Sequence, residues 1–254
     1  MTHLTSEDKS VPSGNWEASQ LQAVVFLRKA VSPADIFSAI TGEAPDTQED
    51  RPKEGVRVQT GPFLRGSLQV ILNPIRIDVM LSPVLGPEIL LGGASQTLGD
   101  FATTLEDFAS AIRKWLPGSG LPASRLALVA KALARADSTT AAYQILKDTL
   151  TSVIVEPGTM QDLMFRVNWR AESAHMPERY LNRLTTWAAI TAKTQAGPAG
   201  SLPTVQVEER HYAYREIDVN TPAEHSEELP SDQLVPIFDE LLAIVVSTAK
   251  GGEK

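Results

Sequence analysis

Two stretches of the chain carry the same pattern, a strand-like apolar run that leads through a serine into an amphipathic helix. The first lies at residues 22–40 and the second at residues 125–146. In the first stretch, Ser32 and Pro33 provide a helix cap and a proline at the first helical position. In the second, Asp137 or Ser138 takes the capping position. A pattern that recurs in this way predicts an internal duplication.

Each half continues with segments that alternate apolar and polar side chains, as strands do, and ends in a segment with the three- and four-residue spacing of a helix. The predicted strands are 22–31, 56–60, 64–72, 75–81, 126–134, 162–170, 180–194 and 205–219, and the predicted helices are 33–40, 97–115, 139–150 and a last one that begins near 235–236. The acidic stretch 43–55 is expected to be a loop. The sequence therefore predicts an α+β fold with two related β-α-β-β-β-α lobes, each an antiparallel sheet with helices packed on one face.

The length of 254 residues is enough for two lobes of ordinary domain size. We predict a flexible N-terminal arm at 1–20, a first lobe at 21–116, a linker at 117–124 and a second lobe at 125–250. The linker stretch is short and rich in proline and glycine, as flexible connections are. The pattern leaves open whether the two sheets join into one.

The composition excludes some classes of chemistry. The chain has no cysteine, which excludes disulfides and thiolate catalysis. The first residues have no apolar signal segment, and no apolar run reaches the roughly 18–20 residues of a membrane span, so we expect a cytoplasmic protein with no membrane contact. A net charge of -8 argues against a large sequence-independent affinity for nucleic acid, although it allows a local basic patch.

No recognisable catalytic or metal-binding motif is present in the sequence. The four histidines are far apart, so none is paired with another ligand at a spacing that aims both at one ion. A phosphate-binding glycine loop and a Gly-x-Ser-x-Gly elbow are both missing. The sequence predicts no catalytic residue, no metal and no cofactor, and favours a binding protein over an enzyme. A catalytic triad assembled from scattered residues stays open.

Arginine and tyrosine mark the polar faces of the strands predicted in the second half. Residues 125–215 hold eleven Lys and Arg against eight Asp and Glu, although the whole chain is acidic. The candidate binding surface consists of Met164, Arg166, Asn168, Arg170, Arg183, Arg210, Tyr212 and Tyr214. Such side chains on an open sheet stack on bases, bind phosphates or anchor a protein interface. In the competing interpretation the arginines pair with glutamates of neighbouring strands, namely Glu172, Glu178, Glu208 and Glu216.

Four segments of the second half carry a resemblance to known proteins. They are 124–133, 141–146, 162–170 and 181–190, the last of which includes Asn182, Arg183 and Leu184. In these segments the chain resembles a sporadically distributed, uncharacterised family of bacterial proteins of similar length. The resemblance implies a bacterial origin and an α+β fold, and it carries over no activity.

These observations lead to one leading functional hypothesis and two alternatives. We expect a non-enzymatic cytoplasmic protein that presents a sheet face to a protein partner, or to a second copy of itself through an open sheet edge. In the first alternative, the protein contacts nucleic acid, with Arg166, Arg170, Arg183 and Arg210 on phosphates and Tyr212 or Tyr214 stacked on bases. In the second, the cleft between the lobes binds a small molecule or carries an active site, with Arg170 or Arg183 on an anionic group.

Overall fold

The computed structural model describes residues 15–31, 35–84, 97–176, 179–196 and 206–251. The elements follow in the order β1 (Trp16–Leu27), α1 (Ile36–Thr41), β2 (Thr47–Arg51), β3 (Val56–Phe63), β4 (Gly66–Asn73), β5 (Arg76–Ser82), α3 (Phe101–Trp115), the 3-10 helix η1 (Leu116–Gly118), β6 (Ala123–Ala136), α4 (Thr139–Thr149), β7 (Met164–Glu172), β8 (Tyr180–Ala196), β9 (Gln206–Asn220), the 3-10 helix η2 (Ser231–Gln233) and α5 (Leu234–Gly251).

The strands of both halves form one continuous sheet. The order of its nine strands is β2-β3-β4-β5-β1-β6-β9-β8-β7, and each neighbouring pair is antiparallel. The halves meet where β1 pairs with β6, with Val24 opposite Ala127. Because this pairing is continuous, one hydrophobic core extends under both halves, from Leu21 and Leu68 to Ile217 and Phe238.

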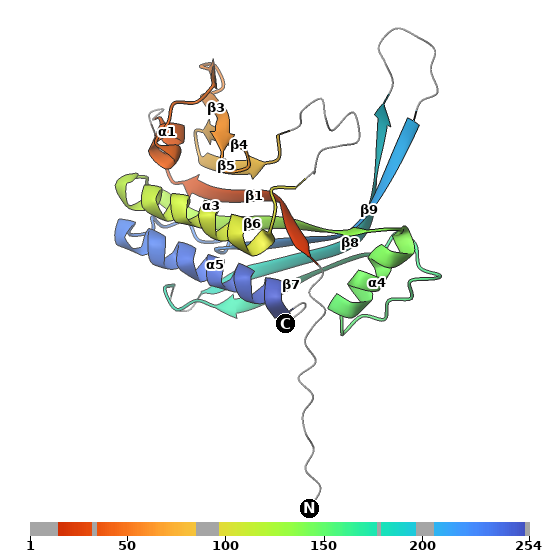
Figure 1. Ribbon diagram of the computed structural model, residues 1–254. Helices are drawn as coiled ribbons and strands as arrows, with labels where there is room; N and C mark the ends of the chain where they lie inside the picture. Colours follow the sequence, from red (N-terminus) through yellow and green to blue (C-terminus); the bar gives the residue numbers. More distant parts are fainter. Residues whose placement is uncertain (1–14, 32–34, 85–96, 177–178, 197–205, 252–254) are drawn as a thin grey trace, which may run out of the picture.

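The four described α-helices lie on the same face of this sheet (Figure 1). α3 and α5 run side by side over the middle strands and are joined by the ion pair of Arg113 with Asp239. α4 covers the far end of β6, β8 and β9, where Tyr143 and Leu146 pack in a second apolar cluster with Trp187. The opposite face of the sheet therefore has no described helix over it.

α1 packs closely on β3 because of a glycine. A Cβ on Gly61 would lie 2.7 Å from the Phe37 ring, so only glycine lets this ring reach the sheet. The backbone N–H of Phe37 donates to Gln59 Oε1 at 3.2 Å, which satisfies the amide of this buried strand residue. These contacts fix α1 on the same side of the sheet as α3.

The α+β class and the placement of helices on one face of an antiparallel sheet are confirmed. Several boundaries differ. β1 begins at Trp16, so residues 16–20 belong to the sheet and not to the arm, and β6 begins at Ala123, inside the predicted linker. Residues 47–51 of the expected acidic loop form the edge strand β2, because backbone pairing with β3 and the ion pair between Arg57 and Asp50 hold them there.

The helix caps differ in the two halves. Ser138 caps α4 by accepting a hydrogen bond from the backbone N–H of Ala141, which confirms one of the two expected caps. α1 begins at Ile36 and its cap is Asp35, whereas Ser32 and Pro33 lie outside the described residues. A short 3-10 turn leads into α5, as Pro236 near its start predicts.

Candidate functional site: the open face of the sheet

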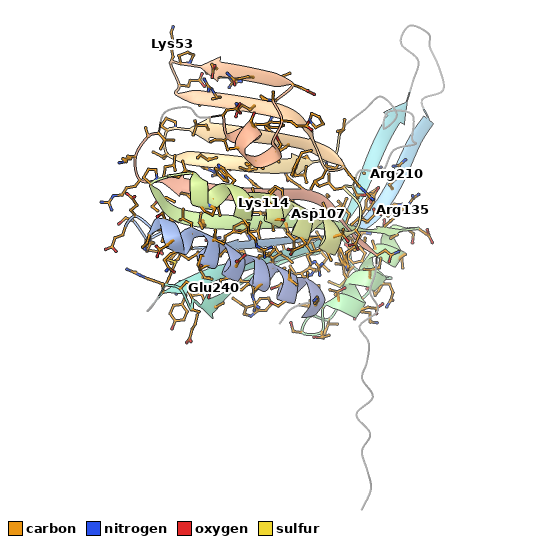
Figure 2. All side chains as sticks on the ribbon, turned by 60° about the vertical axis from the view of Figure 1, so that its left-hand side comes forward. Lys53, Asp107, Lys114, Arg135, Arg210 and Glu240 are labelled. Atoms are coloured by element: carbon orange, nitrogen blue, oxygen red, sulfur yellow. The ribbon has the colours of Figure 1, made fainter. Side chains whose placement is uncertain are left out.

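We call the face of the sheet opposite the helices the open face. Strand register decides which side chains share it, because directly paired residues point to the same side. In the second half these residues include Arg125, Val129, Lys131, Leu133 and Arg135 of β6, Arg210, Tyr212, Tyr214, Glu216, Asp218 and Asn220 of β9, Tyr180, Asn182, Leu184, Thr186, Ala188 and Ile190 of β8, and Met164, Arg166, Asn168, Arg170 and Glu172 of β7. Figure 2 shows Arg135 and Arg210 near the end of the sheet from which β8 and β9 project, whereas Asp107, Lys114 and Glu240 lie on the helices.

The structure places seven of the eight predicted surface residues on this face. Met164, Arg166, Asn168 and Arg170 are exposed along the edge strand β7, and the Met164 side chain is 72% exposed. Arg210, Tyr212 and Tyr214 lie two strands away on β9.

The two tyrosines are less accessible than the arginines of β7. Tyr212 is only 5% exposed between its neighbours in β6 and β8. The hydroxyl of Tyr214 donates to Glu216 Oε2 at 2.6 Å, and burial together with the Glu216 charge raises the pKa of this phenol. The Tyr212 ring is therefore not free for stacking on a base, and the Tyr214 ring is half-buried.

Arg183 is the exception, and its prediction was wrong. It pairs with Trp169, so it points to the helix side of the sheet, away from Arg166 and Arg170. Its guanidinium lies 5.1 Å from the centre of the Trp169 ring. Partial burial lowers the pKa of this group, and its Nε is buried without a hydrogen-bond partner among the described residues. The reason is that side chains alternate, so an odd-numbered residue of β8 cannot share the open face with Asn182 and Leu184.

A chain of side-chain amides crosses three strands of the open face. Asn168 Nδ2 donates to Asn182 Oδ1 at 3.2 Å, Asn182 Nδ2 donates to Asn220 Oδ1 at 3.1 Å, and Asn220 Nδ2 donates to Asp218 Oδ1 at 2.9 Å. Burial raises the pKa of Asp218 and the charge of Glu216 adds to this effect, while the bond from Asn220 opposes it. This chain of hydrogen bonds holds the polar side chains in fixed positions.

Of the four residues in this series of hydrogen bonds, only Asn168 is among the surface residues predicted from the sequence. The polar alternation of Asn182 with Thr186, and of Asp218 with Asn220, carries the same signal in the neighbouring strands. Each strand can be read for its own two faces, but matching the faces of different strands needs the register between them.

The charges of the open face are partly compensated. Lys131 Nζ lies 3.8 Å from Glu216 Oε2, and the charge of Arg166 acts on Asp218 from a longer distance. Within the part of the chain that the structure describes, no ion pair includes Arg135, Arg166 or Arg170. Among the described residues, these three therefore do not make the expected pairing with Glu172 or Glu216, whereas Glu178 and the side chain of Glu208 lie outside the described part of the chain. The three arginines leave positive charge on one face of an acidic chain.

A polar pocket of about 310 Å³ lies at the end of β7 and β8. Its lining includes Arg170, Arg179, Tyr180, Asn182 and Glu224. All residues that line this pocket belong to the second half of the chain.

Among the described residues, no three His, Asp or Glu side chains come together as ligands of a metal ion. None of the described helices combines the length and the apolar character that crossing a bilayer requires. The fold defines an α+β protein whose antiparallel sheet is covered by helices on one side and has no described helix on the other. Comparison with protein-family models finds no matching family, and comparison with curated proteins finds no matching sequence.

Proposed function

We propose that this is a non-enzymatic binding protein that presents the open face of its sheet to a protein partner. The observation that carries the proposal is the placement of all four described α-helices on the other face. Apolar groups such as Leu184 and Met164 lie on the open face among fixed polar groups and unpaired arginines. Protein interfaces combine apolar contacts, arginine and hydrogen-bonding groups in this way.

A protein partner fits the charge of the surface better than nucleic acid does. The chain carries a net charge of -8, and Glu216 and Asp218 stand in the middle of the arginine-bearing region. Base stacking needs accessible aromatic rings, whereas Tyr212 is buried and Tyr214 is half-buried. A protein surface with a few acidic groups complements Arg135, Arg166 and Arg170 without meeting repulsion over a long stretch.

We also infer that the two halves arose by duplication and that the protein works in the cytoplasm. What supports the duplication is the order of elements. From the central pair outward the sheet continues β1-β5-β4 on one side and β6-β9-β8 on the other, and each half closes with a long helix, α3 or α5. The absence of cysteine fits a reducing compartment.

The test compares variants of the open face with a variant of the helix face. Arg135→Glu and Met164→Glu change exposed side chains of the open face, and Lys114→Glu makes the same charge change as Arg135→Glu on α3 (Figure 2). The wild type and the variants are used as bait in native lysate, at low and moderate salt, with and without nuclease. Thermal unfolding confirms that each variant folds.

We expect the wild type and K114E to retain the same stoichiometric protein after nuclease treatment, and R135E and M164E to lose it. If all four proteins retain the partner protein equally, the open face is not the binding surface. If nucleic acid alone is recovered, and its binding falls steeply with salt, the arginines bind phosphates and the partner is nucleic acid.

A further inference from the structure

The strand β7 ends the sheet, with no neighbour on its outer side among the described residues. It is nine residues long and contains neither proline nor lysine, the residues that commonly protect an edge. The opposite edge strand, β2, has five residues that are all exposed, and Glu49, Asp50 and Arg51 make it strongly charged. The outer edge of β7 is therefore the longer and more apolar of the two open edges.

We propose that β7 pairs with β7 of a second copy of the chain, antiparallel, about a twofold axis at Trp169. This inference does not require the proposed function, because it concerns backbone pairing along the outer edge of β7, although Arg166 and Glu172 stand on the open-face side of that strand. In this arrangement Trp169 faces its own copy, and residues equally far from it in opposite directions face each other.

Charge complementarity selects the second copy as the occupant. With the axis at Trp169, Arg166 stands opposite Glu172 of the second copy, and the symmetry repeats this pair. Both side chains are exposed in the single chain and neither has an ion pair with another described residue. Opposite charges placed directly across neighbouring strands stabilise their pairing.

The apolar side of β7 is also completed by the second copy. Phe165, Val167 and Trp169 point to the helix side but are only partly buried, at the margin of the second apolar cluster. A twofold axis perpendicular to the sheet keeps the helices of both copies on the same side. Trp169 then contacts its counterpart, and the apolar row continues across the junction.

Three other registers are less favourable. An axis at Ala171 also sets Arg170 opposite Glu172, but it leaves only residues 170–172 of β7 paired with the second copy. An axis at Asn168 places Arg166 opposite Arg170 in both symmetric positions, where like charges repel. An axis at Val167 places Arg166 opposite Asn168 and gives no ion pair. An axis between two residues would set open-face side chains against helix-side ones, which the pleat forbids.

The experiment measures dimer dissociation by sedimentation equilibrium for the wild type, R166E, E172R and the double variant R166E/E172R. Each single change replaces both symmetric ion pairs with like charges, so we expect the dissociation constant to rise at least about tenfold. The double variant restores opposite charges and should return to within about threefold of the wild type. The Arg135→Glu variant makes the same charge change as R166E away from the edge, and should leave dimerisation unchanged.

A wild type that stays monomeric at every concentration overturns the proposal, as does a dimer that neither single variant weakens or that the double variant fails to restore. Arg166 also acts on Asp218, so E172R and the milder E172Q carry the test if R166E does not fold. Hydrogen exchange locates the contact, since β7 amides should gain protection as protein concentration rises. If E172R still captures the partner protein and R135E does not, partner binding by the open face does not depend on dimerisation through the β7 edge.

Discussion

Arg215 is a cation buried on the helix side of the sheet, and its replacement tests how burial and contacts balance there. Its side chain is 2% exposed, and its Nη1 donates to the carbonyl oxygen of Ala249 at 2.9 Å. The guanidinium lies 4.5 Å from the centre of the Trp16 ring and 5.6 Å from that of Phe101. No carboxylate of the described residues forms an ion pair with it.

The cost of burying this charge is close to what its contacts return. Burial lowers the pKa of Arg215 from its ordinary value to about 10, which corresponds to about 3 kcal/mol of lost solvation. The charged hydrogen bond to Ala249 returns about 1.5–3 kcal/mol. Each ring contact, with Trp16 and with Phe101, returns about 0.5–2 kcal/mol. The contacts together return about 2.5–7 kcal/mol. The lost solvation offsets most of this amount together with the buried Nε of Arg215, which has no hydrogen-bond partner among the described residues and costs about 1–3 kcal/mol.

We expect Arg215→Met to change the free energy of unfolding by less than about 1.5 kcal/mol, because methionine keeps most of the apolar volume and removes the buried charge. Arg215→Ala should cost about 2–5 kcal/mol because it leaves a cavity. Arg215→Lys should be less stable than Arg215→Met, since an ammonium is more strongly hydrated than a guanidinium and does not stack on the rings.

Urea denaturation followed by circular dichroism measures all three variants, and unchanged m values show that the unfolding reaction is comparable. A loss above about 3 kcal/mol in Arg215→Met would refute the reasoning, because the charge would then be strongly stabilising. A lysine variant as stable as the wild type would refute the role assigned to the rings.

Two further predictions concern carboxylates. Burial raises the pKa of Asp218 above 3.8, so its protonated form is favoured in the folded state: this contribution is present below 3.8 and is lost as pH rises through the raised value. Asp218→Asn should therefore be more stable than the wild type at pH 7, and this advantage should shrink as the pH falls. Urea titrations between pH 3 and 7 measure the free energy of unfolding of both proteins. A difference between them that does not change with pH would contradict the prediction. Asp100 caps α3 by accepting from the Thr103 N–H at 2.8 Å, and Asp100→Ala should cost about 1 kcal/mol whereas Asp100→Asn should cost little. Hydrogen bonds from Thr103 lower the pKa of Asp100. The loss of stability in the alanine variant should therefore be complete above pH 3.8 and should fade as the pH drops through the lowered pKa. Equal losses of stability in the alanine and asparagine variants at pH 7 would show that the cap hydrogen bond is not the cause.

Local patterns in the sequence were enough for several features. Alternation in residues 162–170 predicts which side chains of β7 share one face, and the structure has Arg166, Asn168 and Arg170 there together. The aromatic spacing in residues 97–115 predicts a helix, which the structure places at Phe101–Trp115. Such features depend on residues only a few positions apart. Apolar side chains that recur every two residues indicate one face of a strand, and those that recur every three to four residues indicate one face of a helix.

Long-range pairing decided the rest. Arg183 is not part of the open face because the register between β7 and β8 sets it opposite Trp169. A shift of one residue in this register would place its side chain on the other face of the sheet. Residues 47–51 became a strand because β3 offers them a partner, although their composition is that of a loop. Asp218 and Asn220 joined Asn168 through two strand pairings that no local pattern contains.

By itself the sequence determined the α+β class, the alternating faces of its strands and the positions of its long helices, because these follow from the local periodicity of apolar side chains. Tertiary structure alone decided that β1 pairs with β6 into one sheet and that one face of it stays open. The reason is physical: a strand can hydrogen-bond to any edge that presents free backbone groups. Which edge it meets depends on the packing of the whole core, and no single segment of the sequence encodes that choice.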